Sequence, residues 1–125
     1  MNMFSDLFAA PEVATAQELK KAYAHPNIVV IDVRSPGEIT TKVDVSGKGA
    51  LWFNAPGTPL ANPDLAPGGA VASQLPKNKA TPIIVYCASG KRSQKAASIL
   101  REQGYENVLN AGGIGQISGL PVVKA

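Results

Sequence analysis

The chain has 125 residues, of which 45% are hydrophobic and 17% are charged. This length and balance are typical of one compact domain, and they argue against a disordered chain, a fibrous repeat or a second domain. The 12 basic residues outnumber the 9 acidic ones by 3 but form no stripe along the sequence, and only 6% of the residues are aromatic. This pattern argues against a nucleic-acid partner, whereas the small positive excess favours attraction of a small anion.

The sequence contains one cysteine, Cys87, and one histidine, His25. The chain therefore forms no intrachain disulfide, and we expect neither a metal site nor any other cofactor. No apolar run reaches the roughly 18 residues that a membrane-spanning helix needs, and residues 1–10 lack the basic start and long apolar stretch of a targeting signal. These features predict a cytoplasmic protein without membrane contact.

The first predicted elements are a helix and a strand. Residues 15–18 have the spacing of a capping box, so a helix is expected to begin there and to continue over residues 19–24. His25-Pro26-Asn27 should stop it. The β-branched run of residues 28–33 does not alternate with polar residues. Such a run is typical of a strand buried on both faces of a sheet.

The middle of the chain predicts shorter elements. Residues 35–38, Ser-Pro-Gly-Glu, repeat the capping pattern, so a short helix should follow the first strand directly. Residues 42–49 are polar and irregular, and residues 50–54 indicate a second short strand. The prolines and glycines of residues 55–79 favour turns, with one weak helix near residues 69–75.

The last third of the chain predicts a strand over residues 82–87, a helix over residues 93–103 that Gly104 ends, and a strand over residues 107–109. Strands that alternate with helices and are apolar throughout indicate an α/β fold, with a parallel sheet of four to five strands and helices on both faces. Ligands bind such sheets at the carboxyl ends of the strands. This rule selects residues 32–35 and 87–93 as the functional edge.

The loop that contains the cysteine reads Cys87-Ala88-Ser89-Gly90-Lys91-Arg92-Ser93. A thiol between a strand and a helix N-terminus lies near unpaired backbone N–H groups and near two basic residues, which favours the thiolate. The small residues after the cysteine let these N–H groups converge into an anion-binding nest. A lone cysteine is more commonly a buried small hydrophobe. The polar and basic residues that follow it here favour a functional role, with the sulfur at a polar cleft.

These motifs resemble the single-domain rhodanese (thiosulfate sulfurtransferase) family. The family loop Cys-x-x-Gly-x-Arg-Ser is matched over residues 87–93, and residues 31–34 with Glu38 match its Asp-x-Arg strand. Gly112-Gly113 and residues 119–122 match its usual ending. The likeness covers about residues 15–123 of a single domain, 1–125, and leaves residues 1–14 as an N-terminal extension.

Two departures from the family pattern stand out. The segment that contains residues 42–50 keeps only the final Gly-Ala of the family's Gly-His-Ile-x-Gly-Ala, which leaves its packing open. The Trp that commonly follows the Gly-Gly pair is absent, and Ile117 is the nearest large apolar residue.

The resemblance implies a two-step sulfur transfer. Cys87 attacks a small anionic sulfur donor such as thiosulfate, releases sulfite and becomes a persulfide. The backbone of Ala88, Ser89, Gly90, Lys91, Arg92 and Ser93 cradles the persulfide, and Arg92 with Lys91 attracts the donor. Because the chain has no second cysteine, the acceptor comes from outside as cyanide, glutathione or a protein thiol.

Two other functions remain open at this stage. A cysteine phosphatase or arsenate reductase also uses Cys, a backbone cradle and Arg at a strand-to-helix turn. Those phosphatases place five residues between Cys and Arg, whereas four intervene here. A non-catalytic rhodanese-like interaction module is the third reading, although such modules often lose the cysteine that this chain retains.

Other polar and aromatic residues are given structural roles. We expect Asp32 and Arg34 to pair and support the loops, and His25 to lie at the opposite sheet edge from Cys87. Solvated side chains are expected at Lys95 and Arg101. Core packing is favoured for Trp52 and Phe53, and Ser89 and Ser93 either cap the helix or donate to the persulfide.

Overall fold

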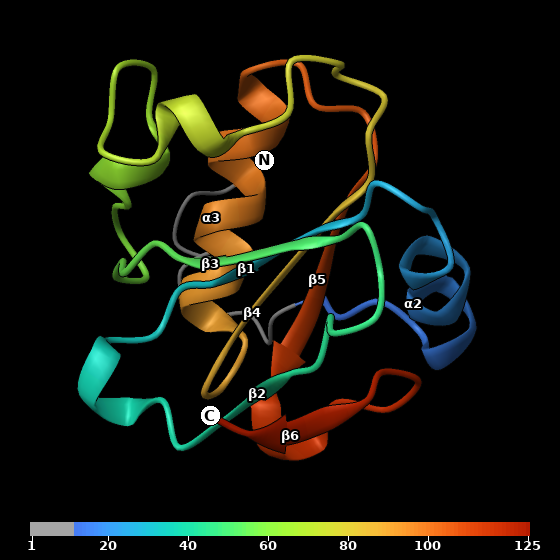
Figure 1. The fold of residues 1–125 in the computed structure, drawn as a ribbon. Helices are drawn as coiled ribbons and strands as arrows, with labels where there is room; N and C mark the ends of the chain where they lie inside the picture. The colour runs from blue at the N-terminus through green and yellow to red at the C-terminus, as the bar shows by residue number, and fades with distance from the viewer. Residues whose placement is uncertain (1–11) are drawn as a thin grey trace.

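The computed structural model describes residues 12–125 (Figure 1). Residues 1–11, which hold most of the predicted extension 1–14, lie outside the described part of the chain. The remaining residues of that extension, 12–14, contact the main sheet. The Ala14 N–H donates a hydrogen bond to the Asn110 carbonyl at 2.8 Å.

The centre of the molecule is a parallel sheet of four strands (Figure 1). Their spatial order is β3 (Leu51–Asn54), β1 (Val29–Asp32), β4 (Ile83–Cys87) and β5 (Val108–Gly113). Every residue of the two central strands, β1 and β4, is buried, as expected of continuous apolar runs. The predicted α/β fold with a parallel sheet of four to five strands is thereby confirmed.

Helix α3 (Lys91–Glu102) covers one face of this sheet. Its buried Ala96 and Leu100 belong to a core cluster that includes alternate residues of β1 and β4. The helix begins two residues before the predicted start at residue 93, because Gly90 takes the N-cap position in the left-handed region with φ +93°. It ends at Glu102, and Gly104 with φ +94° then reverses the chain as predicted.

The other face is covered by helix α2 (Ala16–Tyr23) and by a small antiparallel sheet of β2 (Thr41–Val43) and β6 (Val122–Lys124). Leu19 of α2 and Val43 of β2 pack with the remaining apolar side chains of the central strands in a second core cluster. The predicted capping box of α2 is present: Thr15 Oγ1 accepts the Glu18 N–H at 3.1 Å.

Several short elements differ from the sequence-based expectations. The helix expected after β1 is one 3-10 turn, Pro36–Glu38, and the weak helix near residues 69–75 is reduced to the 3-10 turn Ala72–Gln74. Two strands were not predicted, because β2 and β6 are three residues each and pair across most of the chain. β2 overlaps the segment expected to be irregular, and β5 continues four residues past its predicted end.

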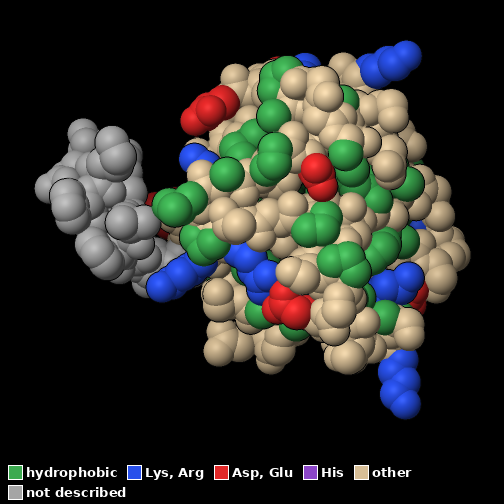
Figure 2. All heavy atoms as spheres, turned by 90° about the vertical axis from the view of Figure 1, so that its left-hand side faces the viewer, with side chains coloured by type: hydrophobic (Ala, Val, Ile, Leu, Met, Phe, Trp, Pro, Cys, Tyr) green, Lys and Arg blue, Asp and Glu red, His purple; other side chains and the backbone are tan. Residues whose placement is uncertain are grey.

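On the face seen in Figure 2, basic and acidic side chains are interspersed among polar and hydrophobic ones. Within residues 12–125, no helix has both the length and the apolar character needed to cross a bilayer.

Candidate active site

Cys87 is the last residue of β4, and a three-residue loop joins it to α3. The first strand ends beside it, because Asp32 of β1 pairs in register with Tyr86. On the other side, Cys87 is opposite Gly113 of β5. A side chain at Gly113 would collide with the Ala88 carbonyl oxygen. The sulfur therefore lies at the carboxyl edge of the sheet, and the absence of a side chain at Gly113 lets the loop close against β5.

The sulfur accepts hydrogen bonds from the loop and the helix. The Gly90 N–H donates to Cys87 Sγ at 2.9 Å, and Ser93 Oγ lies 3.4 Å from the same sulfur. Gly90 turns its N–H inward because it adopts φ +93°, which costs a glycine nothing. Ser93 belongs to the first turn of α3 and faces the loop. Gly90 and Ser93 are two of the six residues expected to cradle a persulfide, and here they contact the sulfur of the free cysteine.

Cys87 is fully buried, with no exposed surface. The sequence predicts a sulfur at the wall of a polar cleft, and this is wrong for the conformation observed. The physical reason is that the loop backbone and Ser93 contact the sulfur from above, while core residues of the α3 face pack below it. Of the other loop residues, Ala88, Ser89 and Lys91 are exposed.

The environment of the sulfur favours the thiolate. Burial raises the pKa of Cys87, but the Ser93 hydroxyl and the backbone N–H groups of Ser93, Ser89 and Gly90 act in the opposite direction. The hydrogen bonds outweigh the burial, so the pKa of Cys87 lies below its usual range. A buried thiol surrounded only by hydrocarbon would shift the other way.

Arg92 is paired with an acid that the sequence did not assign to the site. Its guanidinium donates to both carboxylate oxygens of Glu38, at 2.7 and 2.9 Å. This pair lowers the pKa of Glu38 to about 2, with the Arg92 hydrogen bond as the largest cause. The Arg92 charge also interacts with Cys87. The sequence indicates Glu38 as a helix cap and as part of the family's Asp-x-Arg pattern, but the 3-10 turn that brings it to Arg92 cannot be derived from spacing.

Asp32 and Arg34 form a buried ion pair, with Arg34 Nη2 2.7 Å from Asp32 Oδ2. Arg34 also donates to the backbone carbonyls of Glu38 and Thr41, at 3.4 and 2.6 Å. The pair therefore connects the end of β1 to the 3-10 turn and to β2. These contacts are those of a structural support for the loop that carries Glu38.

One buried polar side chain next to the cradle was not predicted. Asn110 of β5 accepts from the Gly112 N–H at 2.9 Å, and its Oδ1 lies 2.7 Å from Ser93 Oγ. Its Nδ2 donates to the carbonyls of Gly90 and Glu12, each at 3.1 Å. An asparagine in a short strand carries no sequence signal of such a role. Only the close packing of β5 against the loop shows it.

The residues given structural roles are mostly placed as expected. His25 precedes the amino end of β1, whereas Cys87 lies at the carboxyl end of the parallel strand β4. Phe53 is in the core, and half-buried Trp52 donates to the Tyr86 hydroxyl at 2.9 Å. Arg101 is exposed, as expected of a solvated side chain, and it also donates to the Val108 carbonyl at 2.7 Å.

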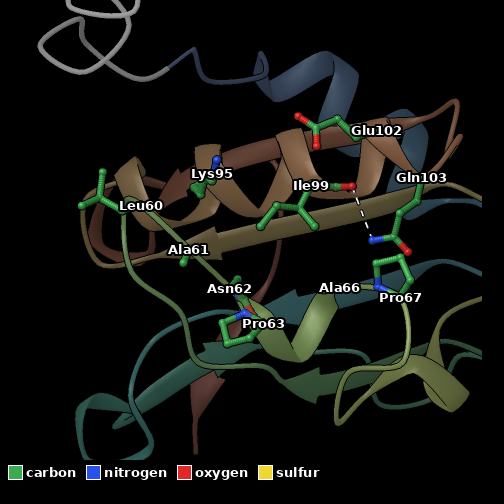
Figure 3. A pocket seen from close by; sticks show the side chains of 10 residues that line it. All are labelled: Leu60, Ala61, Asn62, Pro63, Ala66, Pro67, Lys95, Ile99, Glu102 and Gln103. Atoms are coloured by element: carbon green, nitrogen blue, oxygen red, sulfur yellow. Dashed lines mark hydrogen bonds between the residues drawn. The ribbon is translucent and has the colours of Figure 1, made fainter.

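A cavity of about 530 Å³ lies between α3 and residues 60–67 (Figure 3). Its walls include Leu60, Pro63 and Ile99, with Lys95 and Gln103 on the helix side. Cys87 is not among the lining residues. The chemistry of the site therefore rests on the contacts of the sulfur and not on this cavity.

The fold and the site together define an α/β domain with a hydrogen-bonded cysteine at a strand-to-helix turn. The family model of the rhodanese-like domain matches residues 15–118, and the chain belongs to this family.

Similar proteins and solved structures agree with this family membership. A sulfurtransferase of Allochromatium vinosum is 33% identical over 101 residues, which cover 78% of this chain and 79% of the relative. The thiosulfate sulfurtransferase PspE of Escherichia coli is 43% identical over 54 residues, 43% of this chain and 50% of that protein. Among solved structures, a rhodanese with anions from E. coli superposes with a TM-score of 0.57 at 34% identity, and the match covers 78% of this chain and 99% of that one.

Proposed function

We propose that this protein is a sulfurtransferase that moves a sulfane sulfur from thiosulfate, or a similar anionic donor, to cyanide or a thiol through a persulfide on Cys87. The observation that carries the proposal is the hydrogen-bonded sulfur. Its Sγ accepts the Gly90 N–H at 2.9 Å, and its pKa is lowered despite full burial. A thiolate is the form of cysteine that attacks sulfur.

The first half-reaction forms one S–S bond and breaks another. The Cys87 thiolate attacks the outer sulfur of thiosulfate, and the bond between the two thiosulfate sulfurs breaks. Its electron pair leaves with sulfite, so that the enzyme holds a persulfide. The cradle supports this step because a persulfide anion needs donors, and the loop offers the N–H groups that now reach Sγ.

The second half-reaction returns the thiolate. The external nucleophile attacks the terminal sulfur, and the electron pair of the persulfide S–S bond returns to Cys87 Sγ. Because the chain has no other cysteine, this acceptor is an external molecule such as cyanide, glutathione or a protein thiol.

The burial of Cys87 adds a requirement for access. Cys87 is enclosed while the loop residues Ala88 and Ser89 above it are exposed, so a donor reaches the sulfur only when the loop moves. The donor also meets Arg92 in its pair with Glu38. The anion therefore competes with the Glu38 carboxylate for the guanidinium.

Two relatives support an anionic donor. The E. coli structure superposed above was solved with anions, and the E. coli relative that matches about half of this chain is named for thiosulfate. The rival phosphatase reading lacks comparable support, because Arg92 binds Glu38 and only four residues separate it from Cys87.

Intact-mass measurement after incubation with thiosulfate tests the proposal. We expect a gain of about 32 Da, one sulfur atom, which cyanide then removes as thiocyanate, because one thiolate accepts one sulfur. Cys87→Ser should gain nothing. Ser73→Ala, an exposed serine in the distant 3-10 turn, should behave as the unsubstituted protein.

Three results contradict the proposal. These are no mass gain in the intact protein, a gain that survives Cys87→Ser, and turnover of an aryl phosphate in place of thiosulfate. The last result supports the phosphatase alternative. Cellular function that is unimpaired by Cys87→Ser supports an interaction module instead.

A further inference from the structure

Two residues that contact the Cys87 sulfur, Gly90 and Ser93, are also hydrogen-bonded to one buried side chain, Asn110, which is 4% exposed. Asn110 Oδ1 lies 2.7 Å from Ser93 Oγ, and its Nδ2 donates to the Gly90 carbonyl at 3.1 Å. Ser93 Oγ and the Gly90 N–H are the groups 3.4 and 2.9 Å from Sγ. One amide thus joins the two sides of the sulfur cradle.

The amide orientation is fixed by its neighbours. The Gly112 N–H can only donate, so the atom that it meets at 2.9 Å is the amide oxygen. The carbonyls of Gly90 and Glu12 can only accept, so they face the amide nitrogen. All these contacts agree on one orientation of Asn110. Its four partners hold the side chain rigidly.

The Ser93 hydroxyl has one proton and two nearby acceptors, Asn110 Oδ1 and Cys87 Sγ. With a neutral thiol, the hydroxyl donates to Asn110 Oδ1. With a thiolate, the same hydroxyl shares its proton between Sγ and Oδ1, both of which it contacts, and Oδ1 also keeps the Gly112 N–H as a donor. Both protonation states of Cys87 therefore leave every buried polar atom of this group with a partner.

We propose that Asn110 is a positioning residue that keeps the Ser93 hydroxyl and Gly90 within hydrogen-bonding distance of Cys87 Sγ, and through them stabilises the thiolate. Asn110 contacts no reacting atom. Its relevance to sulfur transfer rests on the proposed function, but its effect on the thiolate exists without any sulfur substrate. The charged group that acts on the sulfur is Arg92, with Glu38 as its counter-ion, and substitution of Asn110 leaves both in place.

Titration of the Cys87 thiolate tests the proposal. We expect Asn110→Ala to raise the pKa of Cys87 by about one unit, the size of one weakened hydrogen bond to an anion. Ser93→Ala should raise it by a similar amount. The double variant should raise it by less than the sum, because Asn110 acts partly through Ser93. The ultraviolet absorbance of the thiolate, with Cys87→Ser as the blank, provides the measurement.

Asn107→Ala is the matched control. Asn107 precedes the amino end of β5, and its side-chain amide donates to the Ala80 carbonyl at 2.8 Å, at the opposite end of the strand from the sulfur. The Asn107→Ala substitution removes one side-chain hydrogen bond, as Asn110→Ala does, but it should leave the pKa of Cys87 unchanged.

Three outcomes overturn the inference. A folded Asn110→Ala variant with an unchanged thiol pKa means that Asn110 has no influence on the sulfur. A lowered pKa of Cys87 in this variant means that Asn110 competes with the sulfur for the Ser93 proton and does not direct that proton to the sulfur. Strictly additive effects of the two substitutions mean that Asn110 does not act through Ser93.

A second measurement keeps the inference testable if Asn110→Ala does not fold. In the unsubstituted protein, the NMR signals of the Asn110 side-chain amide and the Gly112 N–H should shift with the same pKa as Cys87. The Asn107 side-chain signal should not shift at that pKa. If the Asn110 signals do not shift when Cys87 titrates, the inference is overturned. Neither measurement uses thiosulfate, so a failed persulfide experiment together with a coupled titration refutes the proposed function alone.

Discussion

The residue that balances the basic charge next to the sulfur is Glu38. Its carboxylate binds Arg92 through two hydrogen bonds, and it also accepts the Ser35 N–H at 3.0 Å. Because the pKa of Glu38 is about 2, the pair persists at neutral pH. The Arg92 guanidinium is therefore already paired in the absence of a donor. Under the proposed function, an anionic donor has to compete with Glu38 for this guanidinium.

We expect Glu38→Gln to lower the KM for thiosulfate about two- to fivefold, the range typical of one exposed ion pair, with little change in kcat. The glutamine side chain still has an oxygen that can accept the Ser35 N–H, but it no longer neutralises the positive charge of Arg92. Steady-state kinetics at low salt provide the measurement. Glu106→Gln, which makes the same charge change at an exposed position after α3, is the control for net charge. An unchanged or raised KM would show that Glu38 does not compete with the donor.

At the scale of elements, the turn from β4 into α3 depends on one backbone conformation. Gly90 ends the loop, begins the helix and presents its N–H to the sulfur. Gly104 ends the same helix with nearly the same φ, +94° against +93°, and a side chain there would meet nothing within 4 Å. The two glycines therefore carry similar conformational strain if replaced, but only one of them contacts the sulfur.

This contrast gives a matched pair of substitutions. Gly90→Ala and Gly104→Ala should each lower the free energy of unfolding by about 1–2 kcal/mol, because an L side chain is disfavoured at positive φ. Only Gly90→Ala should also raise the pKa of Cys87 and slow persulfide formation. Denaturant unfolding and thiol titration of both variants measure this. A raised thiol pKa in both variants would mean that general loss of stability causes the effect.

Elements with a local sequence signal could be predicted, whereas those formed by long-range pairing could not. The β-branched runs and the capping box at Thr15 carry local signals that predicted the central strands and α2. The loop sequence predicted that Cys87 ends a strand before a helix, but not that its sulfur is buried. β2 and β6 carry no such signal, because their pairing joins residues near 42 and 123. Glu38 and Asn110 reach the site through such distant contacts, so local patterns could not identify either role.

At the scale of the whole molecule, Tyr86 connects the two sheets. Its hydroxyl accepts the Val43 N–H of β2 at 3.2 Å and the Trp52 Nε1–H of β3 at 2.9 Å. Burial is the largest cause that raises the pKa of Tyr86, to about 12, from an ordinary value of 10.0. The folded protein therefore holds this phenol proton more tightly than the unfolded chain does.

The sign of the pH effect follows from linkage. A group with a raised pKa in the folded state contributes stability that is complete below its unfolded pKa and is lost as the pH rises through the folded value. Between pH 10 and about 12, the unsubstituted protein should therefore lose free energy of unfolding relative to Tyr86→Phe, which has no phenol to titrate. Denaturant unfolding of both proteins across this range provides the measurement. A difference that stays constant would mean that Tyr86 titrates alike in both states.

Gly113 has a consequence for any attempt to transplant this chemistry. Strand β5, which packs against the loop after Cys87, has a glycine and no side chain beside the Ala88 carbonyl. The conformation of the loop therefore depends on this neighbouring strand. A designer who grafts only residues 87–93 onto another scaffold would meet a collision wherever the adjacent strand carries a larger residue. The smallest portable module is therefore discontinuous and includes the glycine end of that second strand.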